Sequence, residues 1–240
     1  MKPFKYQGPE LDIFSLAANW KKYWAGLISP YIRGRVLEVG AGTGNNSHLL
    51  QSLCQGKFSS WTCLEPDRNL MDRLKQALTG EQSTATIRFV QGTIADLSAT
   101  PGYDTVLYID VLEHIADDAA ELAAAADLLA ENGQMIVLSP AHASLYSNFD
   151  REIGHFRRYT VRSLIRLTPE MLRPVLSRYI DSAGMLASLT NRMLLRQSLP
   201  TRKQIKIWDN LFIPVSRILD VVTCGKLGKS VLVVWRKMNV

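Results

Sequence analysis

Short apolar runs alternate with helical patterns along most of the chain, and this alternation predicts the fold. Apolar and β-branched runs at 35–39, 61–65, 87–94, 103–110 and 133–140 each end in polar or glycine residues, which is typical of buried strands and the turns after them. Residues 45–55, 68–79 and 117–131 have apolar positions three and four apart and are predicted helices. The alternation indicates right-handed crossovers and a parallel sheet with a ligand site at the carboxyl ends of its strands.

The pattern changes after Pro140. We expect a helix over 160–172 that begins at Thr160, a sixth strand over 174–181 and a last strand over 229–237 that follows Gly228. Between these strands lie predicted helices at 184–198 and 203–222, interrupted by Pro200 and Pro214. This insert is far longer than a hairpin needs, which favours a substrate lid or a partner surface. At the amino end, 11–31 is a predicted helix with one apolar face, most simply a packing helix.

A glycine-rich turn follows the first strand. Gly40, Gly42 and Gly44 allow positive φ and close approach of a ligand, and the helix that begins at Asn45 offers free amides. The Gly-x-Gly-x-Gly spacing lacks the later glycine of a dinucleotide fingerprint and disfavours a nicotinamide-dependent oxidoreductase.

The acid Glu38, two residues before the first glycine, makes this segment similar to motif I of class I S-adenosylmethionine-dependent methyltransferases. Further matching elements are the strand that ends at Glu65, the strands at 87–94, 103–110 and 133–140, and the segment 111–115; together they cover about residues 30–142. The resemblance implies a Rossmann-like α/β fold with a seven-stranded, mostly parallel sheet, an antiparallel last strand beside the sixth, helices on both faces and a helical insert before the last strand.

We interpret 1–240 as a single methyltransferase domain, since this length suits one α/β core. Within it we distinguish an N-terminal helical arm (1–30), a cofactor-binding core (31–142), an acceptor-site loop (143–160) and a helical insert or lid (183–228).

The resemblance also implies a binding site for S-adenosylmethionine. Glu65 would accept hydrogen bonds from the ribose hydroxyls, and Glu38 would lie near the methionine end. Thr93 stands where many relatives have an aspartate that contacts adenine, so this contact would rest on the backbone of Thr93 and Ile94. The complete expected set is Glu38, Gly40, Ala41, Gly42, Gly44, Asn45, Glu65, Pro66, Gly92, Thr93, Ile94, Asp110 and Val111.

Candidate catalytic residues are Asp110, His114, His142 and His155. Asp110 ends the fourth strand, where it either faces the ligand crevice or caps the following turn. A neutral imidazole can accept a proton near neutral pH, and His155 is the leading candidate for the base. His114 and His142 are also candidates, although the family resemblance suggests a structural or cofactor-proximal role for His114.

The loop over 146–160 is rich in aromatic and titratable residues and is the expected acceptor site. Its candidate substrate-binding residues are Tyr146, Asp150, Arg157, Arg158 and Tyr159. The arginines would hold a carboxylate or phosphate, or would anchor the loop by ion pairs with Asp150 and Glu152. The string 154–160 resembles one in a bacterial methyltransferase subgroup linked to cell-surface glycans, lipids and secondary metabolites.

Charge is divided unevenly along the chain. Residues 1–150 hold 11 Lys and Arg against 17 Asp and Glu, whereas 151–240 hold 17 against 5. The basic half suits an anionic acceptor, a membrane surface or nucleic acid, and equally an ordinary solvated face.

Nucleic acid is disfavoured because 110–113 lacks a base-flipping motif. A peripheral membrane contact is a further hypothesis, with apolar positions at Ile205, Trp208, Leu211, Phe212 and Val215 among Lys203, Lys206 and Arg217.

Three separated cysteines indicate neither a disulfide framework nor a zinc site, and no metal-ligand spacing occurs, so we expect metal-independent chemistry. We found neither a signal segment nor an apolar run long enough to span a bilayer, which predicts a cytoplasmic location, peripheral to the inner membrane face if the membrane hypothesis holds. The oligomeric state stays open.

Together these features predict methyl transfer from S-adenosylmethionine to an oxygen or nitrogen atom of a small-molecule or lipid-linked acceptor, which the basic half suggests is anionic. The alternatives are a non-catalytic S-adenosylmethionine-binding regulatory or partner protein, and a methyltransferase that acts on a protein or carbon acceptor.

Overall fold

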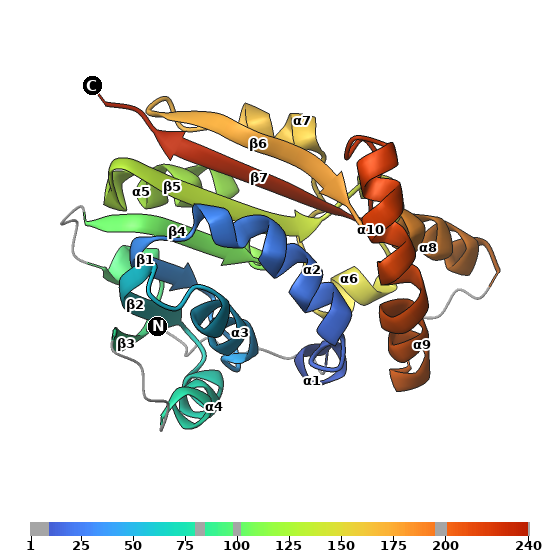
Figure 1. Cartoon of the computed structure of the whole chain (residues 1–240), viewed down its shortest axis with the longest axis horizontal. Helices are drawn as coiled ribbons and strands as arrows, with labels where there is room; N and C mark the ends of the chain where they lie inside the picture. Colours follow the sequence, from blue (N-terminus) through green and yellow to red (C-terminus); the bar gives the residue numbers. More distant parts are fainter. Residues whose placement is uncertain (1–9, 80–84, 98–101, 195–200, 240) are drawn as a thin grey trace.

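The computed structural model describes residues 10–79, 85–97, 102–194 and 201–239. They form a seven-stranded sheet in the order β3-β2-β1-β4-β5-β7-β6 (Figure 1). The strands are β1 Gly34–Val39, β2 Phe58–Glu65, β3 Thr86–Gln91, β4 Tyr103–Ile109, β5 Leu129–Pro140, β6 Leu172–Ile180 and β7 Ser230–Lys237. Strands β1 to β5 pair in parallel, and β7 pairs antiparallel with both β5 and β6. The predicted sheet, including its antiparallel last strand, is confirmed.

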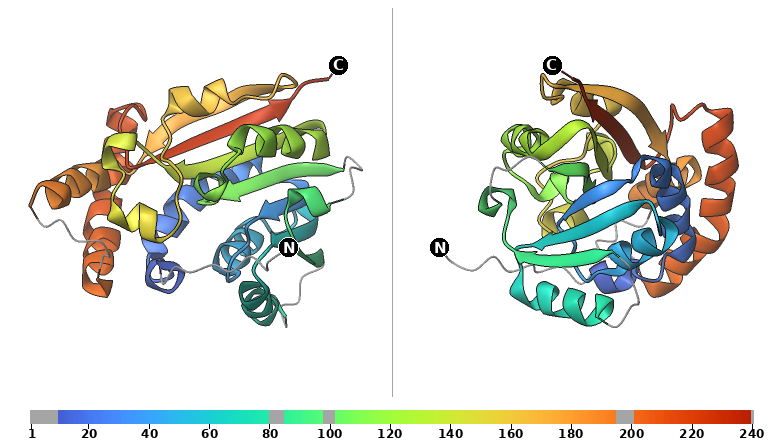
Figure 2. Two further views of the ribbon diagram at one scale, coloured as in Figure 1. Left: turned by 180° about the vertical axis from the view of Figure 1, so that it is seen from behind. Right: turned by 60° about the vertical axis from the view of Figure 1, so that its left-hand side comes forward.

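Helices pack on both faces of this sheet (Figure 2). Helices α2 Ala18–Ile28, α3 Asn45–Leu53 and α4 Arg68–Leu78 cover one face, while α5 Asp118–Leu128 and α7 Val161–Arg166 cover the other. Alternate residues of each strand serve opposite cores, as the two-residue repeat of a strand requires: Val36 packs into the first core and Leu37 into the second.

Three element boundaries differ from the sequence prediction, each for a local reason. The helix expected over 160–172 ends at Arg166, because Thr168 precedes Pro169 and a residue before proline disfavours the helical region. Strand β6 begins at Leu172 and includes Pro174, which is tolerated on an edge strand at a register shift. Helix α5 ends at Leu128, and β5 begins directly after it.

The predicted helix 11–31 is divided into α1 Glu10–Phe14, α2 and a 3-10 turn at Ser29–Tyr31. Helix α2 lacks a side-chain cap of its own. The carboxylate of Asp209, from the distant insert, accepts the backbone amides of Asn19 at 3.0 Å and Trp20 at 2.8 Å. An acceptor at the amides of a first helical turn acts as an N-cap, so the insert itself caps α2.

The insert contains α8 Ser182–Leu194, α9 Arg202–Ile207, a π-helical turn Trp208–Phe212 and α10 Ile213–Val222. Pro200 lies outside the described residues. The prediction that Pro214 interrupts a helix was wrong, because the helical path from α9 to α10 is continuous. Pro214 is the second residue of α10, and the wider π-helical turn directly before it accommodates a residue that has no amide to donate.

Buried aspartates fasten the insert to the sheet and to α2. Asp220 accepts the backbone amides of Asp181 at 2.7 Å and Ser182 at 2.9 Å, and the phenol of Tyr23 at 2.7 Å. Asp181 accepts the indole N–H of Trp208 at 2.9 Å. These hydrogen bonds hold the insert at defined points as a cover over the sheet edge and α2.

Removal of the Asp209 cap is expected to loosen this cover. In Asp209→Ala the first amides of α2 lose their acceptor, and loss of a cap typically costs about 0.5–2 kcal/mol. Hydrogen exchange should become faster at Asn19 and Trp20 and through α9, with smaller changes in β1 and β4. Asn210→Ala, which removes one exposed contact to Asn19, is the matched control. Uniformly faster exchange across the sheet would argue against a local role for the cap.

Among the described residues, no helix is long and apolar enough to cross a membrane.

Candidate active site

Of the three glycines in the turn between β1 and α3, one leaves open space that a ligand could occupy. Gly40, Gly42 and Gly44 have φ values of 66°, 59° and 84°. A Cβ on Gly40 would lie 2.6 Å from a methyl group of Val111, and one on Gly44 would lie 2.9 Å from Leu74, so packing explains these two glycines. A Cβ on Gly42 would meet no atom closer than 4.0 Å. The missing side chain of Gly42 therefore keeps space clear at the end of β1.

Glu65, at the carboxyl end of β2, holds this turn in place. Its carboxylate accepts the amide of Gly42 at 2.8 Å through one oxygen and that of Asp67 at 2.9 Å through the other. Burial raises the pKa of Glu65, and the two amide hydrogen bonds oppose this rise. Each oxygen retains a second lone pair that can accept a ligand hydroxyl.

Glu38 lies deeper than the sequence suggested. Its side chain is 2% exposed, accepts the indole N–H of Trp61 at 2.8 Å and does not line the cavity described below. Burial raises the pKa of Glu38 to about 7, although the bond from Trp61 opposes the shift. The structure thus places this carboxyl beneath the turn, where it is about half protonated near pH 7.

The raised pKa of Glu38 predicts a pH effect on stability. A group with a raised folded-state pKa contributes fully below its unfolded pKa of 4.5, and the contribution is lost as pH rises through about 7. The free energy of unfolding should therefore fall between pH 5 and 8, by up to on the order of 3 kcal/mol from this group. Glu38→Gln should flatten that slope in urea titrations, whereas the exposed Glu131→Gln should keep it. An unchanged slope in Glu38→Gln would refute the assignment.

The turn after β3 is closed on itself. Asp96 accepts both the amide of Thr93 at 2.8 Å and its hydroxyl at 3.0 Å, and these bonds lower the pKa of Asp96. Ile94 is buried in the second core. The Thr93 amide is thus already engaged, and Asp96 is a residue near this turn that the sequence analysis did not single out. Two further residues of the expected cofactor set lie in turns at the same end of the sheet. Gly92, with φ 155°, follows β3, and Pro66 follows β2.

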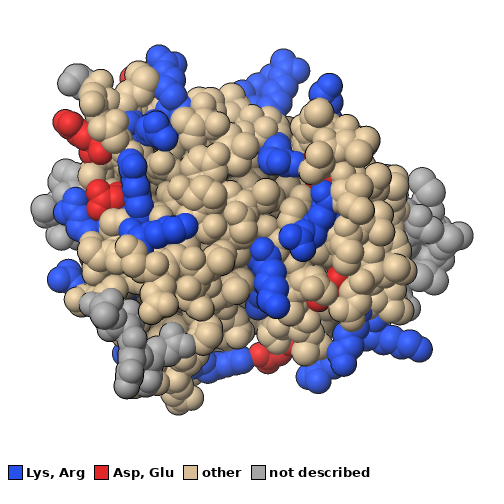
Figure 3. All heavy atoms as spheres, viewed as in Figure 1, with Lys and Arg blue, Asp and Glu red and all other residues tan. Residues whose placement is uncertain are grey.

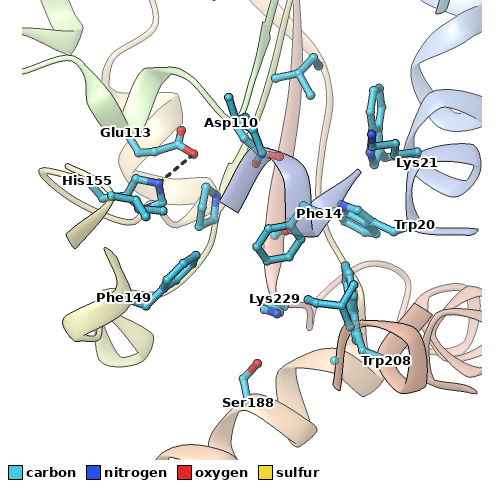
Figure 4. A pocket seen from close by; sticks show the side chains of 18 of the residues that line it. Phe14, Trp20, Lys21, Asp110, Glu113, Phe149, His155, Ser188, Trp208 and Lys229 are labelled. Atoms are coloured by element: carbon cyan, nitrogen blue, oxygen red, sulfur yellow. Dashed lines mark ion pairs between the residues drawn. The ribbon is translucent and has the colours of Figure 1, made fainter. Parts of the chain in front are cut away.

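A cavity of about 700 Å³ opens at the carboxyl ends of β1, β4 and β5 (Figure 4). This volume is within the roughly 300–1,000 Å³ of small-molecule sites. The glycine turn forms one wall, the arm contributes Phe14, Trp20 and Trp24, and the insert contributes Ser188, Ile205 and Trp208. Of the expected cofactor residues, Gly40, Ala41, Gly42, Asn45 and Asp110 line the cavity.

Asp110 stands at the end of β4 in a strained conformation. Its φ is 55°, which is uncommon for a residue with a side chain and is often found at functional sites. The carboxyl group is accessible from the cavity, yet burial within the protein raises its pKa to about 6, against the opposing charges of His155 and Lys229. Near neutral pH this group can exchange a proton.

His155 joins a buried network in the loop that carries α6 Asn148–Glu152. Its Nδ1 lies 2.9 Å from an oxygen of Asp150, and that carboxylate also accepts two bonds from the Arg158 guanidinium at 2.7 and 3.0 Å. Burial alone would raise the pKa of Asp150, but the bonds from His155 and Arg158 prevail and hold it well below its usual range. An ionised Asp150 therefore fixes the orientation of the imidazole through Nδ1. The second ring nitrogen, Nε2, is then the one that can exchange a proton with a ligand.

Glu113 and His114 lie on the far side of His155. The Nε2 atom of His155 is 3.8 Å from Oε1 of Glu113, which has no hydrogen-bond partner among the described residues, while Oε2 accepts the hydroxyl of Ser139 at 2.8 Å. Burial and the charge of Asp110 raise the pKa of Glu113 well above normal. The His114 ring packs edge-on against His155 with centroids 4.5 Å apart, and burial lowers the pKa of His114 to about 4.

These three residues form a group that sequence spacing did not reveal. Glu113, His114 and His155 present ligand atoms within 4.8 Å of one another, close enough to hold a metal ion. The loop that carries His155 folds back against the turn after β4, and no periodicity in the sequence predicts this contact. The expectation of metal-independent chemistry stays a prediction.

Other candidates lie away from the cavity. His142 has its Nε2 3.0 Å from the carbonyl oxygen of Gly228 and stacks on Tyr179, and it does not line the cavity. Arg157 pairs with Asp118 at 2.7 Å, and the Tyr159 hydroxyl donates to the same carboxylate at 2.7 Å. Of the five expected substrate-binding residues, Tyr146 and Arg158 line the cavity.

Two lysines that the sequence analysis missed also line the cavity. Lys21 comes from α2, and Lys229 lies just before β7, with its Nζ 4.9 Å from the centroid of the Trp208 ring. Burial lowers the pKa of both lysines, and in each case an aspartate opposes the shift. Nothing local in the sequence distinguishes them from solvated lysines; the folding of the arm and insert over the sheet brings them here.

A parallel sheet with an antiparallel last strand, a glycine turn after β1 and an acid after β2 is the arrangement of Rossmann-like class I methyltransferases. Residues 37–135 match the family described as "Methyltransferase domain". Residues 37–135 are therefore a methyltransferase domain, and the predicted resemblance to class I S-adenosylmethionine-dependent methyltransferases is confirmed.

Individual relatives are distant. Ubiquinone biosynthesis O-methyltransferase of Xylella fastidiosa is 29% identical over 160 residues, which cover 65% of this chain and 62% of that protein. The alignment thus spans less than two thirds of the relative. Among solved structures, the N-methyltransferase NodS of Bradyrhizobium japonicum has a TM-score of 0.58 at 14% identity, covering 93% of this chain and 97% of its own. The cyclopropane synthase MmaA2 of Mycobacterium tuberculosis has 0.59 at 12%, covering 90% and 82%. These two show a shared fold alone.

Proposed function

We propose that this chain transfers a methyl group from S-adenosylmethionine to an oxygen or nitrogen atom of an anionic acceptor, either a small molecule or the head of a lipid-linked compound. The observation that carries the proposal is one cavity in which the Gly42 clearance, Asp110, His155 and two half-buried lysines, Lys21 and Lys229, meet. The sulfonium of the cofactor supplies the methyl group and the leaving group, so the protein has to position the acceptor and accept its proton.

The cofactor would lie along the glycine turn. The open space above Gly42 and the second lone pairs of Glu65 suit a ribose that carries two hydroxyls. Glu38 would support the turn from below. The contact with adenine stays a prediction. Because the Thr93 amide already donates to Asp96, adenine would have to bind other backbone groups of this turn.

His155 is the proposed general base. Asp150 orients Nδ1 and would stabilise the charged imidazolium, which leaves Nε2 to accept the acceptor proton, as in other oriented imidazole bases. Access to Nε2 would require the ring or the neighbouring Glu113 to adjust, since Nε2 faces that carboxyl at 3.8 Å. Asp110, whose pKa of about 6 suits proton exchange, is the second candidate base.

Lys229 and Arg158 support an anionic acceptor. Both line the cavity beside His155, and Arg158 retains donor groups beyond those that bind Asp150. The Xylella relative is an O-methyltransferase by name, which is consistent with an oxygen acceptor. Nucleic acid is a disfavoured acceptor, and a protein or carbon acceptor is an alternative outcome of the test below.

The test pairs acceptors that differ in one charge. Release of S-adenosylhomocysteine is measured with carboxylated or phosphorylated phenols and amines against their neutral analogues. We expect turnover with the anionic members and a raised KM in Lys229→Met, with S-adenosylhomocysteine affinity retained. Equal turnover of neutral analogues would refute the anionic preference, and binding of the cofactor without turnover across protein, lipid and small-molecule acceptors would favour the regulatory alternative.

Chelation should leave methyl transfer intact. The raised pKa of Glu113 disfavours the ionised carboxylate that a metal ion needs as a ligand. We therefore expect the same turnover before and after dialysis against EDTA, with restoration by Mg²⁺ or Zn²⁺ giving no gain. Loss of activity on chelation, recovered by one of these ions, would assign a metal to the Glu113, His114 and His155 group.

A further inference from the structure

The insert presents an apolar face to the outside of the molecule. This outer face consists of Leu211, Val215, Ile218, Val221 and Val222, all exposed, and of Ile207, which is exposed at its edge and also lines the cavity. Ile218, Val221 and Val222 are 68%, 72% and 73% exposed. A surface helix of a globular protein normally places such residues inward, and contiguous exposed apolar patches mark interaction sites.

The opposite face of α10 is the polar one. Ser216 and Asp220 are fully buried and bonded, with the Ser216 hydroxyl 2.6 Å from a carboxylate oxygen of Asp181. The buried polar groups anchor the helix so that Val215, Ile218, Val221 and Val222 point away from the core, whereas Ile213 packs inside it. Ile205 is buried and Trp208 and Phe212 line the cavity, so three positions of the sequence-based membrane hypothesis point inward.

Charges of one sign surround the outer face. The exposed charged residues of 201–229 are all basic, namely Arg202, Lys203, Lys206, Arg217 and Lys226. The two acids of this stretch, Asp209 and Asp220, are buried. Figure 3 shows the corresponding surface, on the right where Figure 1 places α9 and α10, as tan atoms bordered by blue side chains with little red.

We propose that the outer face docks on an anionic lipid surface, with the apolar residues inserted between headgroups and the basic residues among the lipid phosphates. An apolar helical face with a basic border is the chemistry that binds such an interface. A second copy of the chain fits less well, because two-fold pairing would bring basic borders together. The docked insert also forms a wall of the cavity, so a lipid-linked acceptor would approach from the side that meets the membrane.

Vesicle co-sedimentation of the full chain tests the proposal without an acceptor. We expect binding to vesicles that contain phosphatidylglycerol and little binding to phosphatidylcholine alone. Ile218→Glu with Val222→Glu, and separately Lys203→Glu with Lys206→Glu, should each weaken binding at least about tenfold. Leu53→Glu and Lys75→Glu, at exposed positions of α3 and α4, should retain it. Equal melting temperatures would establish that the variants remain folded.

Three results would overturn the proposal. The first is binding that is indifferent to phosphatidylglycerol, and the second is binding that Ile218→Glu with Val222→Glu leaves unchanged. The third is failure to bind vesicles together with self-association in sedimentation velocity that the same double variant abolishes, which would assign the outer face to a second copy. Because no cofactor or acceptor enters the experiment, its failure is distinct from failure of the proposed methyl transfer.

Discussion

Glu65→Ala is expected to weaken S-adenosylhomocysteine binding about 100-fold. The carboxylate fixes the amides of Gly42 and Asp67 and is the proposed acceptor for the ribose hydroxyls. Hydrogen bonds to a charged group are worth about 1.5–3 kcal/mol each, so loss of two such bonds to a ligand, at the lower end of this range, gives a change of this size. Calorimetric titration measures it directly.

Two further variants make the result specific. Glu65→Gln replaces one accepting oxygen by a donor that faces a backbone amide, so it should also weaken binding. Asp104→Asn removes a half-buried carboxylate that pairs with Arg35 at 3.2 Å and does not line the cavity, and it should leave affinity unchanged. If folded wild type failed to bind S-adenosylhomocysteine but bound NADH, the cofactor assignment would be lost. Retained affinity in Glu65→Ala would confine the error to the role of this residue.

The sheet was predictable because each strand has its own local pattern. The runs that end at Val39, Glu65 and Ile109 are apolar, and polar residues or glycines follow them, so element type follows from neighbours in sequence. The antiparallel direction of β7 followed from the family resemblance and not from any local pattern. Boundaries were less predictable where tertiary contacts decide them, as for α2, whose start depends on Asp209.

The cavity was predictable only in part, because its walls come from distant segments. The glycine turn is contiguous in sequence and could be recognised directly. By contrast, Lys21 and Lys229 meet at the cavity because an arm and an insert both fold over the same sheet edge. Oε1 of Glu113, which has no hydrogen-bond partner among the described residues, lies near Nε2 of His155 because the loop that carries His155 folds back toward the end of β4. Sequence spacing carries no signal for such contacts, whereas the acid and aromatic content of 146–160 did indicate a loop of functional interest.

Asp150→Asn is expected to cost about 3–5 kcal/mol of the free energy of unfolding, the usual penalty when one partner of a buried ion pair is removed. The Arg158 guanidinium, with a side chain 9% exposed, would lose its ionised partner at 2.7 Å. The same change would release His155 from its orienting bond, so methyl transfer should also fall. Urea titration at neutral pH measures the stability loss, with Asp104→Asn, in a more exposed ion pair, as the control expected to cost at most about 1 kcal/mol.

The stability difference between wild type and Asp150→Asn should change with pH in a definite direction. The pKa of Asp150 is held low in the folded state, so its contribution is complete above the unfolded pKa of about 3.9 and is lost as pH falls through the folded value. The stability difference between wild type and Asp150→Asn should therefore be constant above pH 5 and shrink below about pH 4. Adding Arg158→Met to Asp150→Asn should recover part of the loss, because the uncompensated buried charge is then absent. A double variant no more stable than Asp150→Asn would mean that the hydrogen bonds to Ser147 and His155, and not the ion pair, give this loop its stability.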